Sequence, residues 1–155
     1  MGVSMSEQEA WEFLARGHTG ILTTLRRDGW PVALPVWFVI DDRHAYVATP
    51  SQTKKLQRIA HDDRSSLLVE SGVDWAELAA VHLPMRARVL DSTRDVDELR
   101  HAGRLWAAKY ASSGVSDRQA PSATTKHYGT RSFIRLDPAG PLVSWDNARI
   151  RLRTG

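Results

Sequence analysis

The sequence predicts a mainly β protein with short α-helices, folded as an antiparallel Greek-key β-barrel of about six to seven strands. Three observations lead to this prediction. Short runs of β-branched and aromatic residues alternate with turn residues along most of the 155-residue chain. Only a few segments show helical spacing. Barrel closure would also remove the exposed edges that a flat sheet of this length would leave.

The composition fits one globular domain that spans residues 1–155. The chain is 42% hydrophobic and 25% charged, which provides enough apolar material for one core. No apolar run approaches the roughly 18 residues of a membrane span, and the N-terminus lacks a signal-peptide pattern. We therefore expect a cytoplasmic protein that does not bind a membrane.

The cysteine content, the net charge and the histidine spacing restrict the cofactors and partners that the protein can use. The chain contains no cysteine, which excludes a disulfide scaffold and a cysteine nucleophile, so redox chemistry would need a bound cofactor. The net charge is +3, but the basic residues form short clusters and no long stripe interleaved with aromatics. The histidines show no metal-ligand spacing. We expect neither a nucleic acid nor a metal as partner.

The first part of the chain predicts a helix followed by a three-stranded meander. Ser6 to Glu9 form a capping box, and Gly17 ends the helix that begins there. An Asp28-Gly29 turn between two apolar runs is typical of an antiparallel hairpin. The three expected strands are residues 19–25, 31–40 and 44–49.

The rest of the chain predicts two more helices and four more strands. The helices are expected at residues 53–60 and 95–110, and the strands at 65–70, 77–90, 132–136 and 142–146. Pro84 inside the long strand indicates a sheet edge or a bulge. The segment 111–127 has no period and is typical of a loop or lid.

One segment is the strongest candidate for a ligand site. Residues 49–55, Thr-Pro-Ser-Gln-Thr-Lys-Lys, join the end of a strand to the start of a helix. Free amides and the helix dipole favour an anion there, Ser51 and Thr53 can add hydroxyl donors, and Lys54 or Lys55 adds full charge. The same residues would also suit an ordinary helix start with solvated lysines, so the segment alone leaves both interpretations open.

The order of these segments resembles the flavin/deazaflavin-dependent oxidoreductases, a branch of the pyridoxamine 5′-phosphate oxidase-like split β-barrels. The similarity covers about residues 17–90. It rests on the motifs Gly20 to Thr24, Pro31-Val32, Val36 to Phe38, Tyr46 to Thr49, Thr53 to Lys55, Arg64 and Leu67 to Val69. It implies an FMN-binding-like split barrel.

The resemblance also implies how a cofactor would be held. The second strand would lie along the isoalloxazine ring, with contacts from Pro35, Val36, Trp37 and Phe38. The phosphate would bind at the corner formed by Thr49, Ser51, Thr53, Lys54 and Lys55. Arg58 and Arg64 would extend the positive side. This extension would suit the long anionic tail of the deazaflavin coenzyme F-420, which we favour slightly over FMN.

The implied activity is hydride transfer between the bound deazaflavin or FMN and a small organic substrate. No catalytic residue is identified, and Tyr110, Tyr128 and Ser144 are candidate proton donors only if they lie near the ring. Side chains fill the interior of a small barrel, so the ligand must bind outside it. A groove completed by a second subunit would make the protein a homodimer.

Two alternatives stay open. One is a pyridoxamine 5′-phosphate oxidase-like FMN enzyme, which Trp145 and Arg149 support only loosely. The other is a non-enzymatic cofactor-binding or haem-binding split-barrel protein, in which His61 or His127 would ligate the haem.

Overall fold

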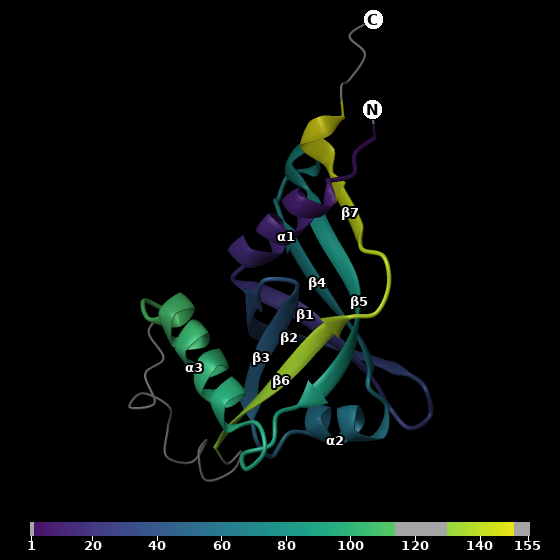
Figure 1. Ribbon diagram of the computed structural model, residues 1–155. Coiled ribbons are helices and arrows are strands. Elements are labelled where there is room, and N and C mark those ends of the chain that lie inside the picture. The colour runs from purple at the N-terminus through teal and green to yellow at the C-terminus, as the bar shows by residue number, and fades with distance from the viewer. Residues whose placement is uncertain (1, 114–129, 151–155) are drawn as a thin grey trace, which may run out of the picture.

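The computed structural model describes residues 2–113 and 130–150. The strands are β1 (Thr19–Leu25), β2 (Pro31–Asp41), β3 (His44–Pro50), β4 (Arg64–Ser71), β5 (Ala79–Val89), β6 (Arg131–Pro138) and β7 (Val143–Asp146). They form one sheet in the order β4-β1-β2-β3-β6-β5-β7, and pairing of β4 with β5 closes all but β7 into a barrel (Figure 1). Every pairing is antiparallel. The predicted mainly β split-barrel fold is confirmed.

Three helices cover different parts of this barrel (Figure 1). α1 (Glu7–Arg16) and α2 (Lys54–His61) pack against opposite ends, and α3 (Val96–Tyr110) lies against the outside of β2 and β3. The predicted capping box begins α1, because Ser6 and Glu9 exchange both hydrogen bonds. Two 3-10 helices, η1 (Trp75–Glu77) and η2 (Asn147–Arg149), complete the described elements. No helix within these residues is long and apolar enough to cross a membrane.

The barrel interior is a packed core. Its inward-facing side chains are almost fully buried and include Leu22, Phe38, Val47, Leu67, Leu83 and Ile134. Gly20 permits this packing, because a Cβ there would lie only 2.9 Å from Cδ1 of Leu67 and 3.2 Å from the ring of Phe38. Such a filled barrel leaves a ligand to bind on the outside.

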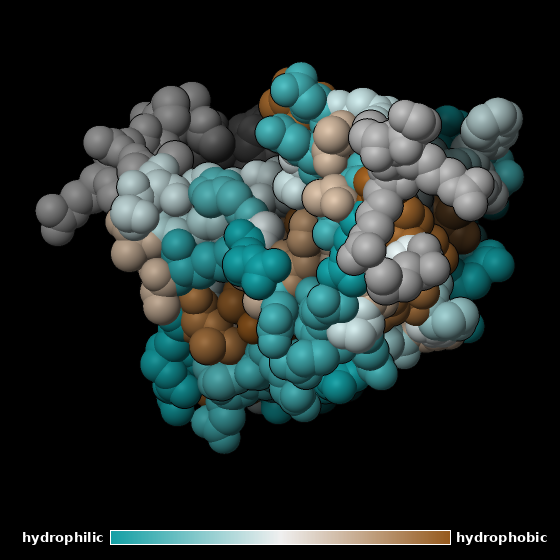
Figure 2. All heavy atoms as spheres, turned by 90° about the horizontal axis from the view of Figure 1, so that it is seen from above, coloured by the Kyte–Doolittle hydropathy of each residue, from teal (hydrophilic) through white to brown (hydrophobic). Residues whose placement is uncertain are grey.

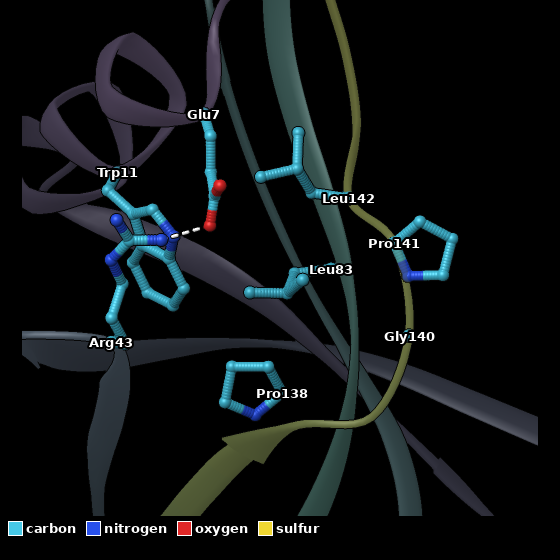
Figure 3. A pocket seen from close by; sticks show the side chains of 8 residues that line it. All are labelled: Glu7, Trp11, Arg43, Leu83, Pro138, Gly140, Pro141 and Leu142. Atoms are coloured by element: carbon cyan, nitrogen blue, oxygen red, sulfur yellow. Dashed lines mark hydrogen bonds and ion pairs between the residues drawn. The ribbon is translucent and has the colours of Figure 1, made fainter.

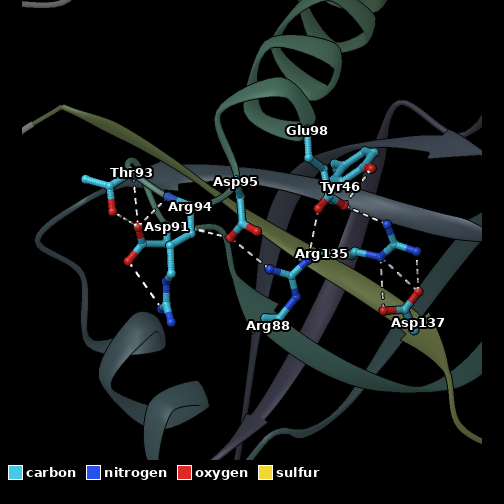
Figure 4. Close-up of polar contacts among 9 residues, drawn as sticks. All are labelled: Tyr46, Arg88, Asp91, Thr93, Arg94, Asp95, Glu98, Arg135 and Asp137. Carbon is cyan, nitrogen blue, oxygen red and sulfur yellow. Dashed lines mark hydrogen bonds and ion pairs between the residues drawn. The ribbon is translucent and has the colours of Figure 1, made fainter.

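A charge network holds the first turn of α3 against the barrel (Figure 4). The carboxylate of Glu98 accepts hydrogen bonds from the Tyr46 hydroxyl at 2.9 Å, from Arg88 at 2.9 Å and from Arg135 at 2.6 Å. Arg88 also reaches Asp95 at 2.8 Å. Beside this network, an apolar face of α3 around Ala102 packs on the outer side of the sheet.

Pro84 does not lie at a sheet edge or at a bulge, so that expectation is wrong. β5 pairs with β4 on one side, and on the other side it pairs with β7 up to His82 and with β6 from Met85 onward. Pro84 stands where the partner changes, and its carbonyl accepts from the amide of Ala139 at 2.9 Å. Its missing N–H therefore falls between the two ladders and removes no strand hydrogen bond.

Candidate functional site

The predicted phosphate corner forms where β3 ends and α2 begins. Thr49 is buried, and its Oγ1 accepts a hydrogen bond from Nζ of Lys55 at 3.0 Å. Oγ1 of Thr53 lies 3.4 Å from Oγ1 of Thr49. Thr53 occupies the N-cap position of α2 but makes no side-chain capping bond. The amide of Ser51 donates to the carbonyl of Thr130 at 2.6 Å, which ties the corner to the start of β6.

Arg58 repeats the arrangement of Lys55 nearly one helical turn later. Its Nε donates to Oγ1 of the buried Thr24 on β1 at 2.8 Å. Burial lowers the pKa of Lys55, with a further contribution from the charge of Arg58, and burial also lowers the pKa of Arg58 itself. Neither cation forms an ion pair with a carboxylate of residues 2–113 or 130–150. Two half-buried cations thus have hydroxyl partners only.

A hollow of about 540 Å³ adjoins this corner. We call it the basic hollow; its lining residues are Arg26, Arg27, Lys54, Gln57, Arg58 and His61. Arg26 and Arg27 were not among the residues predicted from the sequence, because arginines beside an Asp-Gly turn look like ordinary solvated turn residues. The crossover from β3 to β4, which pairs with β1, brings α2 next to the β1–β2 turn. A positively charged surface therefore extends beyond the predicted phosphate corner.

Arg64 does not line the basic hollow. Its guanidinium donates to both carboxylate oxygens of Asp62, at 3.0 and 2.7 Å, and the side chain is exposed. The structure therefore does not bring Arg64 together with Lys55 and Arg58. Its contact with a cofactor tail stays a prediction.

The four residues expected along the ring divide between the two sides of β2. Val36 and Phe38 are 6% and 0% exposed and face the barrel core. Pro35 and Trp37 face outward, and the pairing of Trp37 with Ala48 places this part of β2 next to the residue before Thr49. Only Pro35 and Trp37 offer side-chain surface to a ring, and this contact stays a prediction.

Trp37 is stacked against the C-terminal end of α3. Its ring is parallel to that of Tyr110, with centroids 4.4 Å apart and an interplanar angle of 3°. The Tyr110 hydroxyl accepts from the amide of Phe38 at 2.9 Å and lies 2.7 Å from the carbonyl of Phe38 and 2.8 Å from that of His18. Since a hydroxyl has one proton, it donates to one of these carbonyls at a time. Tyr110 thus joins β2 to the residue before β1.

Lys109 adds a second bond at the same place. Its Nζ donates to the carbonyl of Phe38 at 2.8 Å and lies 4.0 Å from the centroid of the Phe38 ring. Burial lowers the pKa of Lys109 to about 8. The end of α3 therefore holds the middle of β2 through one hydroxyl and one ammonium group.

The candidate proton donors have structural partners or lie outside the described residues. The hydroxyl of Tyr110 is bound to backbone groups, and Oγ of Ser144 accepts from the amide of Met5 at 2.9 Å. Tyr128 and the candidate haem ligand His127 lie outside the described residues.

Arg149 pairs with Glu9 and Asp146 at the α1 end. Within the described ranges, no three His, Asp or Glu side chains are arranged to hold a metal ion.

Comparisons with known proteins agree with this architecture. A family model described as pyridoxamine 5′-phosphate oxidase matches residues 6–140. A biliverdin reductase of Mycobacterium tuberculosis (strain CDC 1551 / Oshkosh), which depends on reduced coenzyme F-420, is 38% identical over 111 residues, or 72% of this chain and 77% of the relative.

Two solved structures share the fold. The conserved hypothetical protein Rv2991 from Mycobacterium tuberculosis has a TM-score of 0.75 at 23% identity, over 99% of this chain and 94% of that one. A FAD-binding protein, mll6688 from Mesorhizobium loti, has a TM-score of 0.70 at 19% identity, over 91% and 94% of the two chains. At the family level, the relatives support a flavin- or deazaflavin-dependent oxidoreductase. Given the match over residues 6–140, the chain belongs to the pyridoxamine 5′-phosphate oxidase family.

Proposed function

We propose that this protein is a reductase that uses reduced coenzyme F-420 as the hydride donor for a small organic substrate. The observation that carries the proposal is the pair of half-buried cations, Lys55 and Arg58, whose described partners are only hydroxyl groups. Partial burial of a charge without a counter-charge is costly, so an anionic cofactor would stabilise this corner. The reductase relative supports the same chemistry.

The residues present fit a cofactor with a long anionic tail. Thr49, Thr53 and Lys55 form a compact corner that would hold a phosphate, and Arg27 extends the positive surface across the basic hollow. Arg26 also lines this hollow, but it pairs with Asp28 at 2.8 Å. FMN would use only the corner, and the tail of coenzyme F-420 would use the hollow as well. When bound, the deazaflavin would supply the hydride. The chain would bind the anionic groups, orient the ring beside outward-facing residues of β2, and exclude water.

Affinity measurements test the choice of cofactor. The apo-protein would be titrated separately with coenzyme F-420, FMN and haem while tryptophan fluorescence is followed. We expect coenzyme F-420 to bind most tightly. Arg27→Ser should weaken its binding about threefold and leave FMN unchanged, because an exposed charge contributes about 0 to 1 kcal/mol. Equal losses for both ligands would contradict the tail model, and binding of haem alone would favour the haem-binding alternative.

Two further variants make this test specific. Arg100→Ser, on α3, removes an exposed arginine that pairs with Asp97 and should change no affinity. Arg64→Ser decides the sequence-based prediction for that residue. Its pairing with Asp62 leads us to expect a smaller loss than for Arg27→Ser.

Turnover separates an enzyme from a cofactor carrier. Biliverdin is the first acceptor to try, because the relative is named for it. We expect reduced coenzyme F-420 to be oxidised only when an acceptor is present. The reaction would be measured as the return of the fluorescence of the oxidised cofactor. Tight cofactor binding without oxidation by any of a panel of acceptors would favour the non-enzymatic alternative.

We also propose that the protein is a homodimer. The strand registers align Pro35, Ile21, Leu68, His82 and Val143 in one row across β2, β1, β4, β5 and β7. None of these five residues belongs to a core cluster of the described part, and the edge of this outer face holds Val143 and Trp145, which are 56% and 37% exposed. A second copy would cover this surface beside Pro35. Light scattering should give twice 17.4 kDa, and a monomer at micromolar concentration would contradict the dimer.

A further inference from the structure

A second hollow, of about 420 Å³, lies beside α1 (Figure 3). We call it the α1 hollow; its lining residues are Glu7, Trp11, Arg43, Leu83, Pro138, Gly140, Pro141 and Leu142. The basic hollow adjoins the turn before β2, and Arg43 stands in the turn after it. Since a strand rises about 3.3 Å per residue, the 11 residues of β2 give a strand roughly 30 Å long, with one of these two turns at each end.

The floor of the α1 hollow is continuous with the barrel core. Leu83 and Trp11 are 2% and 7% exposed, and Leu142 packs against the same core cluster. Pro138 and Pro141 form one wall, whose backbone is restricted by their rings. Seen from the α1 end, the molecule shows hydrophobic patches between hydrophilic side chains (Figure 2). An apolar group that entered this hollow would therefore be removed from water onto a preformed surface.

The polar groups at the mouth are one cation and one acid. Arg43 pairs with Glu7, and the two side chains are 50% and 65% exposed. The guanidinium of Arg43 also lies 5.8 Å from the ring centroid of Trp11. An exposed ion pair contributes little to stability, so another carboxylate can replace that of Glu7 at small cost. Stacking on Trp11 would keep the guanidinium in place during this exchange.

We propose that the α1 hollow is a second binding site, which takes a small apolar monocarboxylate. The hydrocarbon part would lie against Trp11, Leu83 and Leu142, and the carboxylate would pair with Arg43 in place of Glu7. The volume falls within the range of about 300 to 1,000 Å³ found for small-molecule sites. One cation beside one acid does not suit a polyanion such as the proposed cofactor. The proposal does not depend on the proposed function.

Calorimetric titration of the full-length protein with octanoate and with 1-octanol tests this site. We expect octanoate to bind more tightly than 1-octanol. Arg43→Met should weaken octanoate binding about tenfold through loss of a charge-assisted contact and leave 1-octanol unchanged. Glu7→Gln should strengthen octanoate binding about threefold, because it removes the competing carboxylate.

Matched variants connect the result to this hollow. Leu142→Trp should fill it and abolish binding of both probes, with circular dichroism confirming that the variant is folded. Arg26→Met, in the basic hollow, should change neither. The absence of octanoate binding by the unmodified protein would overturn the proposal, and so would an equal loss of both probes in Arg43→Met or unchanged octanoate binding in Glu7→Gln. Coenzyme F-420 should bind Arg43→Met normally, so the two sites can fail independently.

Discussion

Two regions of the barrel use cationic side chains in opposite ways. At the first turn of α3, Arg88 and Arg135 both pair with the carboxylate of Glu98 (Figure 4). At α2, Lys55 and Arg58 reach only threonine hydroxyls among the described residues. The first region is neutralised by the chain itself, whereas the second keeps positive charge available for a ligand.

The pKa values follow the same division. Partial burial would raise the pKa of Glu98, but hydrogen bonds from Arg135, Tyr46 and Arg88 outweigh it and leave the pKa below its ordinary value. Burial lowers the pKa of Lys55, and no carboxylate among its described partners counteracts it. A count of arginines and lysines therefore does not distinguish these two regions, whereas the partners of each cation do.

Loss of the Glu98 carboxylate should have the largest effect on stability. Glu98→Ala leaves Arg88, Arg135 and the Tyr46 hydroxyl without their shared acceptor, so we expect about 2 to 3 kcal/mol of destabilisation in urea unfolding. Cofactor affinity should not change. The control is Asp97→Ala, because that side chain is 97% exposed and its loss should cost less than about 0.5 kcal/mol. Similar losses in the two variants would remove the contrast between the regions.

Lys55→Met should show the reverse pattern. We expect affinity for coenzyme F-420 to fall by about 2 kcal/mol, or roughly 30-fold, through loss of a charge-assisted contact. Stability should stay unchanged or increase, because a half-buried cation without a counter-charge is removed. Fluorescence titration and thermal melting give the two values, with Arg100→Met, at an exposed arginine on α3, as the control. A large loss of stability together with unchanged affinity would make Lys55 a structural residue.

Lys109 allows a pH test of a third cation without a described carboxylate partner. Its pKa is lowered from 10.5 to about 8 by burial. Between these values the unfolded chain binds more protons than the folded one, so stability should rise with pH above about 8. Urea midpoints measured from about pH 7 to about pH 10 should show this rise, and Lys109→Met should reduce it. A rise of equal size in the variant would assign it to other groups.

Glu9 should give the smallest effect, at the α1 end of the molecule. Hydrogen bonds from Arg149 and Ser6 lower its pKa from 4.5 to about 2. Its contribution to stability is therefore present above about pH 4.5 and lost as the pH falls towards 2. Glu9→Gln should flatten the acid limb of the stability curve in that window. An unchanged slope would show that this exposed pair does not contribute.

The order and type of the elements could be predicted from the sequence, because they depend on neighbouring residues. The capping box at Ser6 and Glu9 is such a local signal. The candidate phosphate corner could also be proposed from the sequence, since Thr49, Thr53 and Lys55 are close together along the chain. Membership of the fold class needed no distant contact, because alternating runs and turn residues are read within each segment.

Only the tertiary structure decided which of these residues share a surface. The crossover from β3 to β4 brings α2 next to Arg27, and strand register turns Phe38 into the core while Trp37 faces α3. The change of strand partner at Pro84, from β7 to β6, was also decided by the tertiary structure. These outcomes depend on pairings between segments far apart in sequence, and a shift of register by one residue would reverse every side chain. Local propensity determines which segments form strands, and long-range hydrogen bonding between strands determines which side chains share a surface.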